Sequence, residues 1–117
     1  MEDKNTQVAQ AFLKQTADHL ETDLLPKIRK CVDLLDESDI WWRGSEFENS
    51  VGNLLLHLSG NVRQWIISGV GGAPDQRDRP REFSTRGGIR KAEALSRLEG
   101  TVREAAAVLA GCRRTIF

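Results

Sequence analysis

The residue best placed for chemistry is His57, which lies in the leucine-rich run NLLLHLSGNVRQW at residues 53–65. If this run is a helix, polar side chains fall within about 40° of His57 along its whole length. They are Ser50, Asn53, Asn61, Gln64 and Ser68. Two interpretations are open. The stripe either hydrogen-bonds neighbouring helices or water at the edge of a core, or forms an inward seam where His57 binds a metal, as in many helical bundles.

The other potential metal ligands do not complete a site by their spacing. His19 shares a helical face with Phe12 and Gln15, and we expect it to be a boundary residue. Divalent metals generally need three or more protein ligands, and two histidines on separate helices do not supply them. Cys31 falls on an apolar helical face and is predicted to be a small core residue, whereas Cys112 lies near the end of the chain.

The segment RDRPREF at residues 77–83 concentrates arginines among acidic residues. Guanidinium groups suit carboxylates and phosphates, so Arg77, Arg79 and Arg81 could bind an anion. Internal pairing with Asp75, Asp78 and Glu82 is the interpretation we favour. No phosphate-binding glycine loop, Ser–His–Asp set or pair of carboxylates stands out.

The elements that position these residues read as helices. Residues 6–36 have helical periodicity, but their apolar face changes phase beside Pro26. This predicts a kink or break near residues 22–26, with Thr22 or Asp23 as a cap. Residues 36–48 are predicted to be a connection in which the indole rings of Trp41 and Trp42 are buried in the core.

The second helix should begin at Asn49 or Ser50, both good N-cap residues, and run to about Ser68. Its predicted core face spans about 120° and is made of apolar side chains. They are Val51, Leu54, Leu55, Leu58, Val62, Trp65 and Ile66. A long loop rich in Gly, Pro and charge follows, and then a third helix at about residues 89–110 with Gly111 as its stop. Residues 111–117 read as a frayed tail.

The charge composition excludes some classes of binding partner. The 117 residues carry 17 basic and 17 acidic side chains, so the formal net charge is zero. We therefore expect neither nucleic acid nor an anionic membrane as a partner. The polar N-terminus and the lack of a long apolar run favour a single cytoplasmic domain over residues 1–117.

The order of motifs resembles the DinB-like superfamily of helical-bundle proteins. The resemblance is carried by NSVGNLLLHLSGNVRQWIISGVGG, by RDRPREF after it, and by DLLPKIRKCVDLL and the WW pair before it. It covers about residues 8–110. It implies an all-α four-helix bundle, often dimeric, in which many members bind nickel or zinc through three histidines. His57 matches the histidine of the second helix. Some relatives use the metal to activate the thiol of a small cofactor.

The chain departs from this pattern in the region of the other two ligands. It ends at Phe117, and the H-x-x-x-H pair that the family carries in its fourth helix occurs nowhere in it. We expect an all-α DinB-like bundle shortened to three main helices, with an open apolar groove that a second copy covers. Two functions remain open. The chain is either a non-catalytic module that self-associates as a dimer, or a metal-dependent enzyme of the thiol-transferase kind, with His57 as one ligand and the others supplied by another chain or a missing fourth helix. Whether the chain is an enzyme is therefore left open.

Overall fold

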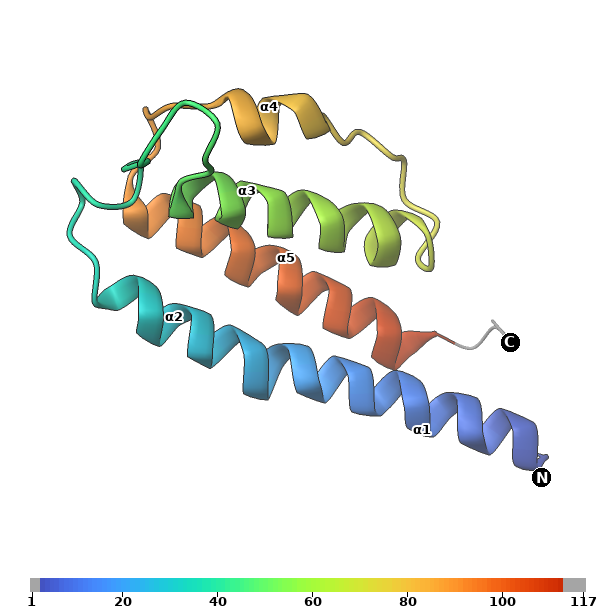
Figure 1. Cartoon of the computed structure of the whole chain (residues 1–117). Helices are drawn as coiled ribbons and strands as arrows, with labels where there is room; N and C mark the ends of the chain where they lie inside the picture. The colour runs from blue at the N-terminus through green and yellow to red at the C-terminus, as the bar shows by residue number, and fades with distance from the viewer. Residues whose placement is uncertain (1–2, 113–117) are drawn as a thin grey trace.

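A computed structural model describes residues 3–112, which contain four helices, three of them long, and no strand. The first long helix is continuous through α1, η1 and α2, and the second through α3 and η2, where η marks a π-helical segment (Figure 1). The bounds are α1 Lys4–Asp18, η1 His19–Leu24, α2 Leu25–Asp33, α3 Val51–Val62, η2 Arg63–Ser68, α4 Arg79–Ser84 and α5 Lys91–Gly111. None of these helices combines the length and apolarity that a membrane span requires.

The sequence predicted a kink or a break near residues 22–26, and a break is wrong, because the chain stays helical through a π-helical segment there. The π-helical turn η1 precedes Pro26, and the residues on either side of that turn keep right-handed helical angles. Thr22 donates its hydroxyl to the Asp18 carbonyl and Asp23 contacts His19 Nδ1 at 3.0 Å, so neither residue caps a helix. Such π turns insert a residue into the register, which accounts for the phase change in the apolar pattern.

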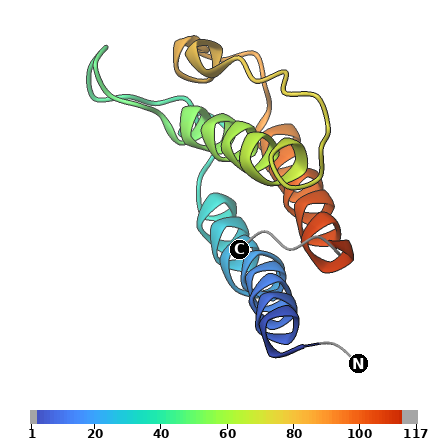
Figure 2. The same cartoon turned by 90° about the vertical axis from the view of Figure 1, so that its right-hand side faces the viewer.

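Helix α5 is the centre of the packing, because both other long helices pack against it (Figure 2). One core cluster lies toward its N-terminal half and includes Leu25, Val32, Leu55, Leu98 and Val102. A second lies toward its C-terminal half and is built from Leu13, Ala17, Ala106 and Leu109. Figure 1 shows α5 lying between α3 on one side and the α1–α2 helix on the other.

The longest helix-free stretch is the connection at residues 34–50, between the first two long helices. Ile40 anchors it, being fully buried and accepting a 2.7 Å hydrogen bond from the Gly52 amide. The Trp41 indole packs against Gly52 and donates its N–H to the Ile89 carbonyl at 2.9 Å. The prediction that both tryptophans plug the core is wrong for Trp42, which is 70% exposed.

The start of α3 is confirmed, since Ser50 is its N-cap and forms a reciprocal capping box with Asn53. The predicted loop after the second helix is only partly a loop. Within it, Asp78 accepts a hydrogen bond from the Arg81 amide and starts the short helix α4, with Pro80 in the first turn. The third long helix begins at Lys91 and includes Gly111, and residues 113–117 of the predicted tail lie outside the described part.

Candidate functional site

The polar stripe of the second helix holds the chain that follows it. We call residues 73–85 the strap. Asn53 is fully buried, and its amide nitrogen donates to the carbonyls of Glu82 at 2.9 Å and Thr85 at 2.8 Å. At the other end, the Ser68 hydroxyl donates to the Pro74 carbonyl at 3.1 Å. The stripe therefore satisfies backbone groups of a neighbouring segment, as the first interpretation of it predicted.

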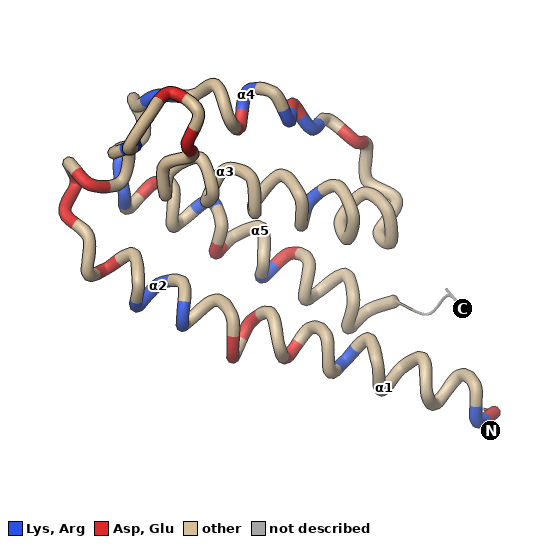
Figure 3. Tube along the Cα trace, in the orientation of Figure 1, with Lys and Arg blue, Asp and Glu red and all other residues tan. Residues whose placement is uncertain are grey.

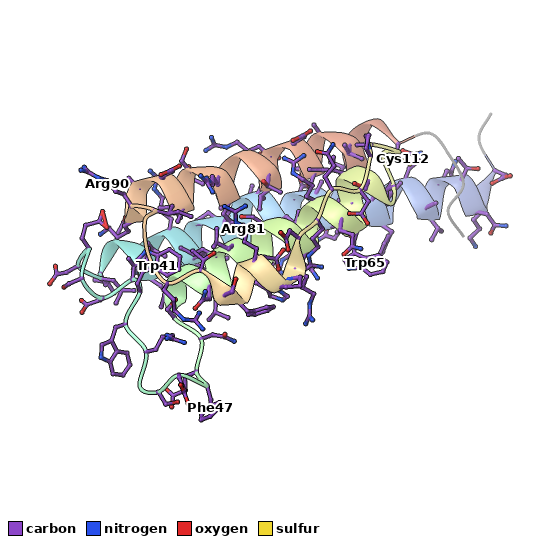
Figure 4. All side chains as sticks on the ribbon, turned by 90° about the horizontal axis from the view of Figure 1, so that it is seen from above. Trp41, Phe47, Trp65, Arg81, Arg90 and Cys112 are labelled. Carbon is purple, nitrogen blue, oxygen red and sulfur yellow. The ribbon has the colours of Figure 1, made fainter. Side chains whose placement is uncertain are left out.

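The centre of this contact is a cluster formed by His57, Arg77 and Glu82. Arg77 binds the Glu82 carboxylate with two parallel hydrogen bonds, Nε to Oε2 and Nη2 to Oε1, both 2.9 Å. His57 Nδ1 lies 3.2 Å from the same Oε1. Glu82 is 8% exposed and the Arg77 side chain 9%, whereas that of His57 is 27% exposed. Figure 4 shows the cartoon from above with all side chains drawn as sticks.

The tautomer of His57 decides which of its two contacts is a hydrogen bond. Its Nδ1 lies 3.2 Å from Arg77 Nη2 as well as from Glu82 Oε1. When Nδ1 carries a proton it donates to the carboxylate and faces a cation; when Nδ1 is bare it accepts from Arg77 instead. One ring nitrogen cannot serve both partners at once, so the imidazole is held by whichever group matches its tautomer.

Glu82 and Arg77 hold each other in their charged forms. Burial alone would raise the pKa of Glu82, but the hydrogen bonds from Arg77 and His57 outweigh it and the pKa lies below its ordinary value. The hydrogen bond to Glu82 likewise raises the pKa of Arg77. The cluster is therefore a buried, bidentate ion pair, in which loss of either partner would strand a charge.

Gly60 makes room for this ion pair on α3. A Cβ atom at this position would overlap the Glu82 carboxylate oxygen and lie 2.8 Å from its carbon. Glycine in the interior of a helix costs about 1 kcal/mol relative to alanine, so its presence there calls for a close approach. This residue was not singled out from the sequence, although a glycine inside a helical pattern is the signal that could have found it.

The three arginines of the strap make different contacts. Arg77 forms the internal pair that the sequence favoured. Arg79 lies with its guanidinium carbon 5.3 Å from the centre of the Phe83 ring, and that ring in turn lies 5.0 Å from the His57 ring. The Arg81 guanidinium makes no ion pair within residues 3–112.

The structure gathers few potential metal ligands around His57. Among the described residues, no group of three or more His, Cys, Asp and Glu side chains is close enough to hold a metal ion. His19 pairs with Asp23 in an exposed position on another helix. Cys31, predicted to be buried, is exposed, and Cys112 is half-buried. The described part of one chain therefore does not fit the three-histidine site that the resemblance implies.

Comparisons of the chain with protein-family models, curated proteins and solved structures found no match. The resemblance to the DinB-like superfamily therefore rests on the sequence motifs.

A second feature of the surface is apolar. Six large apolar side chains of the first two long helices are between 37% and 63% exposed, and we call them the open apolar face. They are Val8, Phe12, Leu24, Leu54, Leu58 and Trp65. All six lie on the apolar helical faces that the periodicity indicates. Trp65 points away from α5 (Figure 4).

The charge pattern sets α3 apart from an ordinary surface helix. Residues 51–62 contain no Asp, Glu, Lys or Arg, and the first charged residue of this long helix is Arg63. Figure 3 shows α3 uncoloured by charge, in contrast to α4 and the first long helix. An exposed helix normally carries charges on its solvent side. One side of α3 contacts the strap and another contacts α5, so within residues 3–112 the open apolar face is the side of α3 whose composition these contacts do not explain.

Proposed function

We propose that this chain is a DinB-like helical module whose function is to self-associate, with the open apolar face of one copy covering that of another. The observation that carries the proposal is the uncharged helix α3 with its exposed leucines Leu54 and Leu58, followed in η2 by the exposed Trp65. Ile66 packs on the cluster that joins Leu13 and Ala17 of α1 to Ala106 and Leu109 of α5, so the two outer helices meet through α5. Each of them carries part of the open apolar face, and a second copy in a twofold dimer would cover both parts.

The size of the face is compatible with a dimer. Six side chains of this kind, each about half exposed, present on the order of 500 Å² of apolar surface per copy, so that a symmetric pair removes roughly 1,000 Å² from water. The flanking half-buried residues Ile28 and Val62 extend the contact toward the roughly 1,200 Å² of the smaller stable interfaces. Burial of this apolar area is the favourable term that would offset the estimated 4–15 kcal/mol cost of association.

The test is the mass of the particle in solution. Sedimentation equilibrium from micromolar to submillimolar concentration should give a dimer for the natural chain. Trp65→Gln and Leu58→Gln, on the open apolar face, should shift the equilibrium to monomer. Leu34→Gln is the matched control, because Leu34 is an exposed apolar residue at the C-cap of α2 that lies off the face.

Tryptophan emission gives an independent readout of the same contact. In a Trp42→Phe background, which removes the other exposed indole, dilution should shift the emission of Trp65 to longer wavelength as it enters water. A chain that remains monomeric at the highest concentration and melts cooperatively would contradict the proposal.

The second candidate is a metal-dependent enzyme of the thiol-transferase kind with His57 as one ligand. The observation in its favour is the contact of Nδ1 with Glu82, because ligating histidines usually donate their second ring nitrogen to a carboxylate. The remaining ligands would have to come from another chain or from a fourth helix, since the described residues do not supply them. Near-stoichiometric nickel or zinc in untagged protein, lost in His57→Ala, would favour this candidate.

A further inference from the structure

The connection between the first two long helices projects from the bundle, and we call residues 42–48 of it the arm. The chain on either side of the arm is fixed to the bundle, because Ile40 is fully buried and Ser50 caps α3. The arm carries the two most exposed aromatic side chains within residues 3–112, Trp42 at 70% and Phe47 at 90%. The packing of the chain therefore leaves two large apolar rings of one short segment in water.

Hydrogen bonds inside the arm hold its backbone in one shape. The Gly44 amide donates to Glu48 Oε2 at 3.0 Å, and the Phe47 amide donates to Ser45 Oγ at 3.3 Å. The Glu48 amide donates to the Ser45 carbonyl at 3.3 Å. A Cβ atom at position 44 would overlap the Glu48 carboxylate, so this turn depends on glycine. The polar groups of the arm thus shape it, and a preshaped segment loses little conformational entropy when it binds.

The arm and the open apolar face lie on the same side of the molecule. In the view from above, Phe47 and Trp65 both point to the side opposite α5 (Figure 4). After a quarter turn of the molecule about the vertical axis, the connection again extends away from α5 (Figure 2). The arm therefore lies beside any molecule that covers the open apolar face.

The area that a dimer needs points to a second copy as the partner of the arm. The open apolar face removes roughly 1,000 Å² from water in a symmetric pair, which is less than the roughly 1,600 Å² of a standard interface. Aromatic side chains bury about 150–250 Å² each. Trp42 and Phe47 of two copies would therefore add on the order of 600 Å², which brings the pair to about the standard size.

The charge of the connection argues against a membrane as the partner of these rings. Residues 36–48 contain five acidic residues and one basic residue, Arg43. An anionic membrane surface would repel this segment. A second copy instead offers Lys27, an exposed cation that lies three residues after Leu24 of the open apolar face.

We propose that the arm of each copy closes over the second copy, with Trp42 and Phe47 as its anchoring side chains. This inference rests on the proposed function, because the second copy is the one that covers the open apolar face. In a twofold pair each arm contacts the other copy, so the two arms flank the contact between the faces. Aromatic anchors are the side chains that most often dominate the energy of an interface.

The first experiment measures the dissociation constant of the dimer by sedimentation equilibrium. Phe47→Ser and Trp42→Ser should each raise it about tenfold or more, since interface aromatics of this kind are frequent hot spots. Both side chains are largely exposed within the chain, so the circular dichroism of the variants should match that of the natural chain. Leu34→Gln is the matched control, because Leu34 is an exposed apolar residue of the same connection outside the arm.

The second experiment identifies the partner by photo-crosslinking. Phe47 is replaced by p-benzoylphenylalanine, and this chain is mixed with an isotope-labelled natural chain before irradiation. We expect crosslinked peptides that join position 47 of one chain to the labelled chain. A dimer that gives no such mixed peptides would overturn the proposal.

The other outcomes separate the arm from self-association itself. A dimer that Trp65→Gln dissociates and that Phe47→Ser leaves unchanged would overturn the arm and leave the proposed function standing. A natural chain that stays monomeric would refute both. In a Trp65→Phe background, emission of Trp42 that shifts with phosphatidylcholine vesicles, and not with protein concentration, would assign the arm to a membrane and would also overturn the proposal.

Discussion

Replacement of Gly60 by alanine should destabilise the chain, although alanine is the better helix former. The new methyl group would occupy the position of the Glu82 carboxylate. The carboxylate must then move, and it would lose hydrogen bonds of 2.9 Å to Arg77 and the 3.2 Å contact with His57. We expect the free energy of unfolding to fall, because this buried charge pair loses its geometry.

The magnitude follows from opposing effects. Alanine in the middle of a helix gains about 1 kcal/mol over glycine. Removal of one partner of a buried ion pair costs about 3–5 kcal/mol, and this is the upper limit here because Gly60→Ala displaces the Glu82 carboxylate without removing it. The net loss should therefore be at most about 2–4 kcal/mol. Gly100→Ala is the matched control, because its methyl group meets nothing and should stabilise the chain by up to about 1 kcal/mol.

The assay is urea denaturation followed by circular dichroism at one fixed protein concentration, since self-association would make stability depend on concentration. The double variant Gly60→Ala/Glu82→Ala removes the clashing carboxylate, so adding Gly60→Ala to Glu82→Ala should cost much less than it does in the natural chain. If Gly60→Ala stabilises the protein as Gly100→Ala does, the packing of Glu82 against α3 described above is refuted.

Two further predictions concern the strap. Because the pKa of Glu82 is lower in the folded chain than its ordinary value of 4.5, its contribution to stability is present above that value. The contribution is lost as the pH falls through the folded-state pKa, and Glu82→Gln should remove this part of the acid sensitivity in urea melts at successive pH values. Asn53→Ala should cost about 2–4 kcal/mol, because it removes the donor to the Glu82 and Thr85 carbonyls and the acceptor of the Ser50 capping bonds, and it should expose residues 73–85 to limited proteolysis. Asn61→Ala, on the same stripe but without such bonds, should change neither; equal effects of both variants would contradict this role of Asn53.

Local signals predicted much of the architecture. The Ser50–Asn53 start of α3 and the all-α class follow from capping chemistry and helical periodicity, which act over a few residues. The phase change beside Pro26 was also visible in the sequence. It indicated a break because a proline usually interrupts a helix, whereas here a π turn accommodates it. Periodicity gives the direction of an apolar face but not the number of residues in each turn.

From the sequence we predicted only the residues that the second helix contributes to the site. The polar stripe was evident, and the internal pairing of strap arginines was favoured, but nothing local links His57 with Glu82, which follows it by 25 residues. Their contact depends on how the strap folds back over α3, and Asn53 fixes that path through backbone carbonyls that carry no sequence signal. A glycine at position 60 indicates that another group lies close to the helix, but only the structure identifies that group as the Glu82 carboxylate.

The open apolar face shows where periodicity stops being informative. An apolar side chain on one side of a helix predicts that this side is buried, and the prediction does not distinguish burial within the chain from burial against a partner. Leu55 and Leu58 have the same residue type on the same predicted core face, yet Leu55 is buried against α5 and Leu58 is exposed. The polar side of α3 forms hydrogen bonds with the strap, and the side that carries Leu55 packs against α5. The third side of α3 carries exposed leucines and no charged residue that would favour contact with water. The apolar periodicity of this side did not predict burial within the chain, but it supports burial against a second copy.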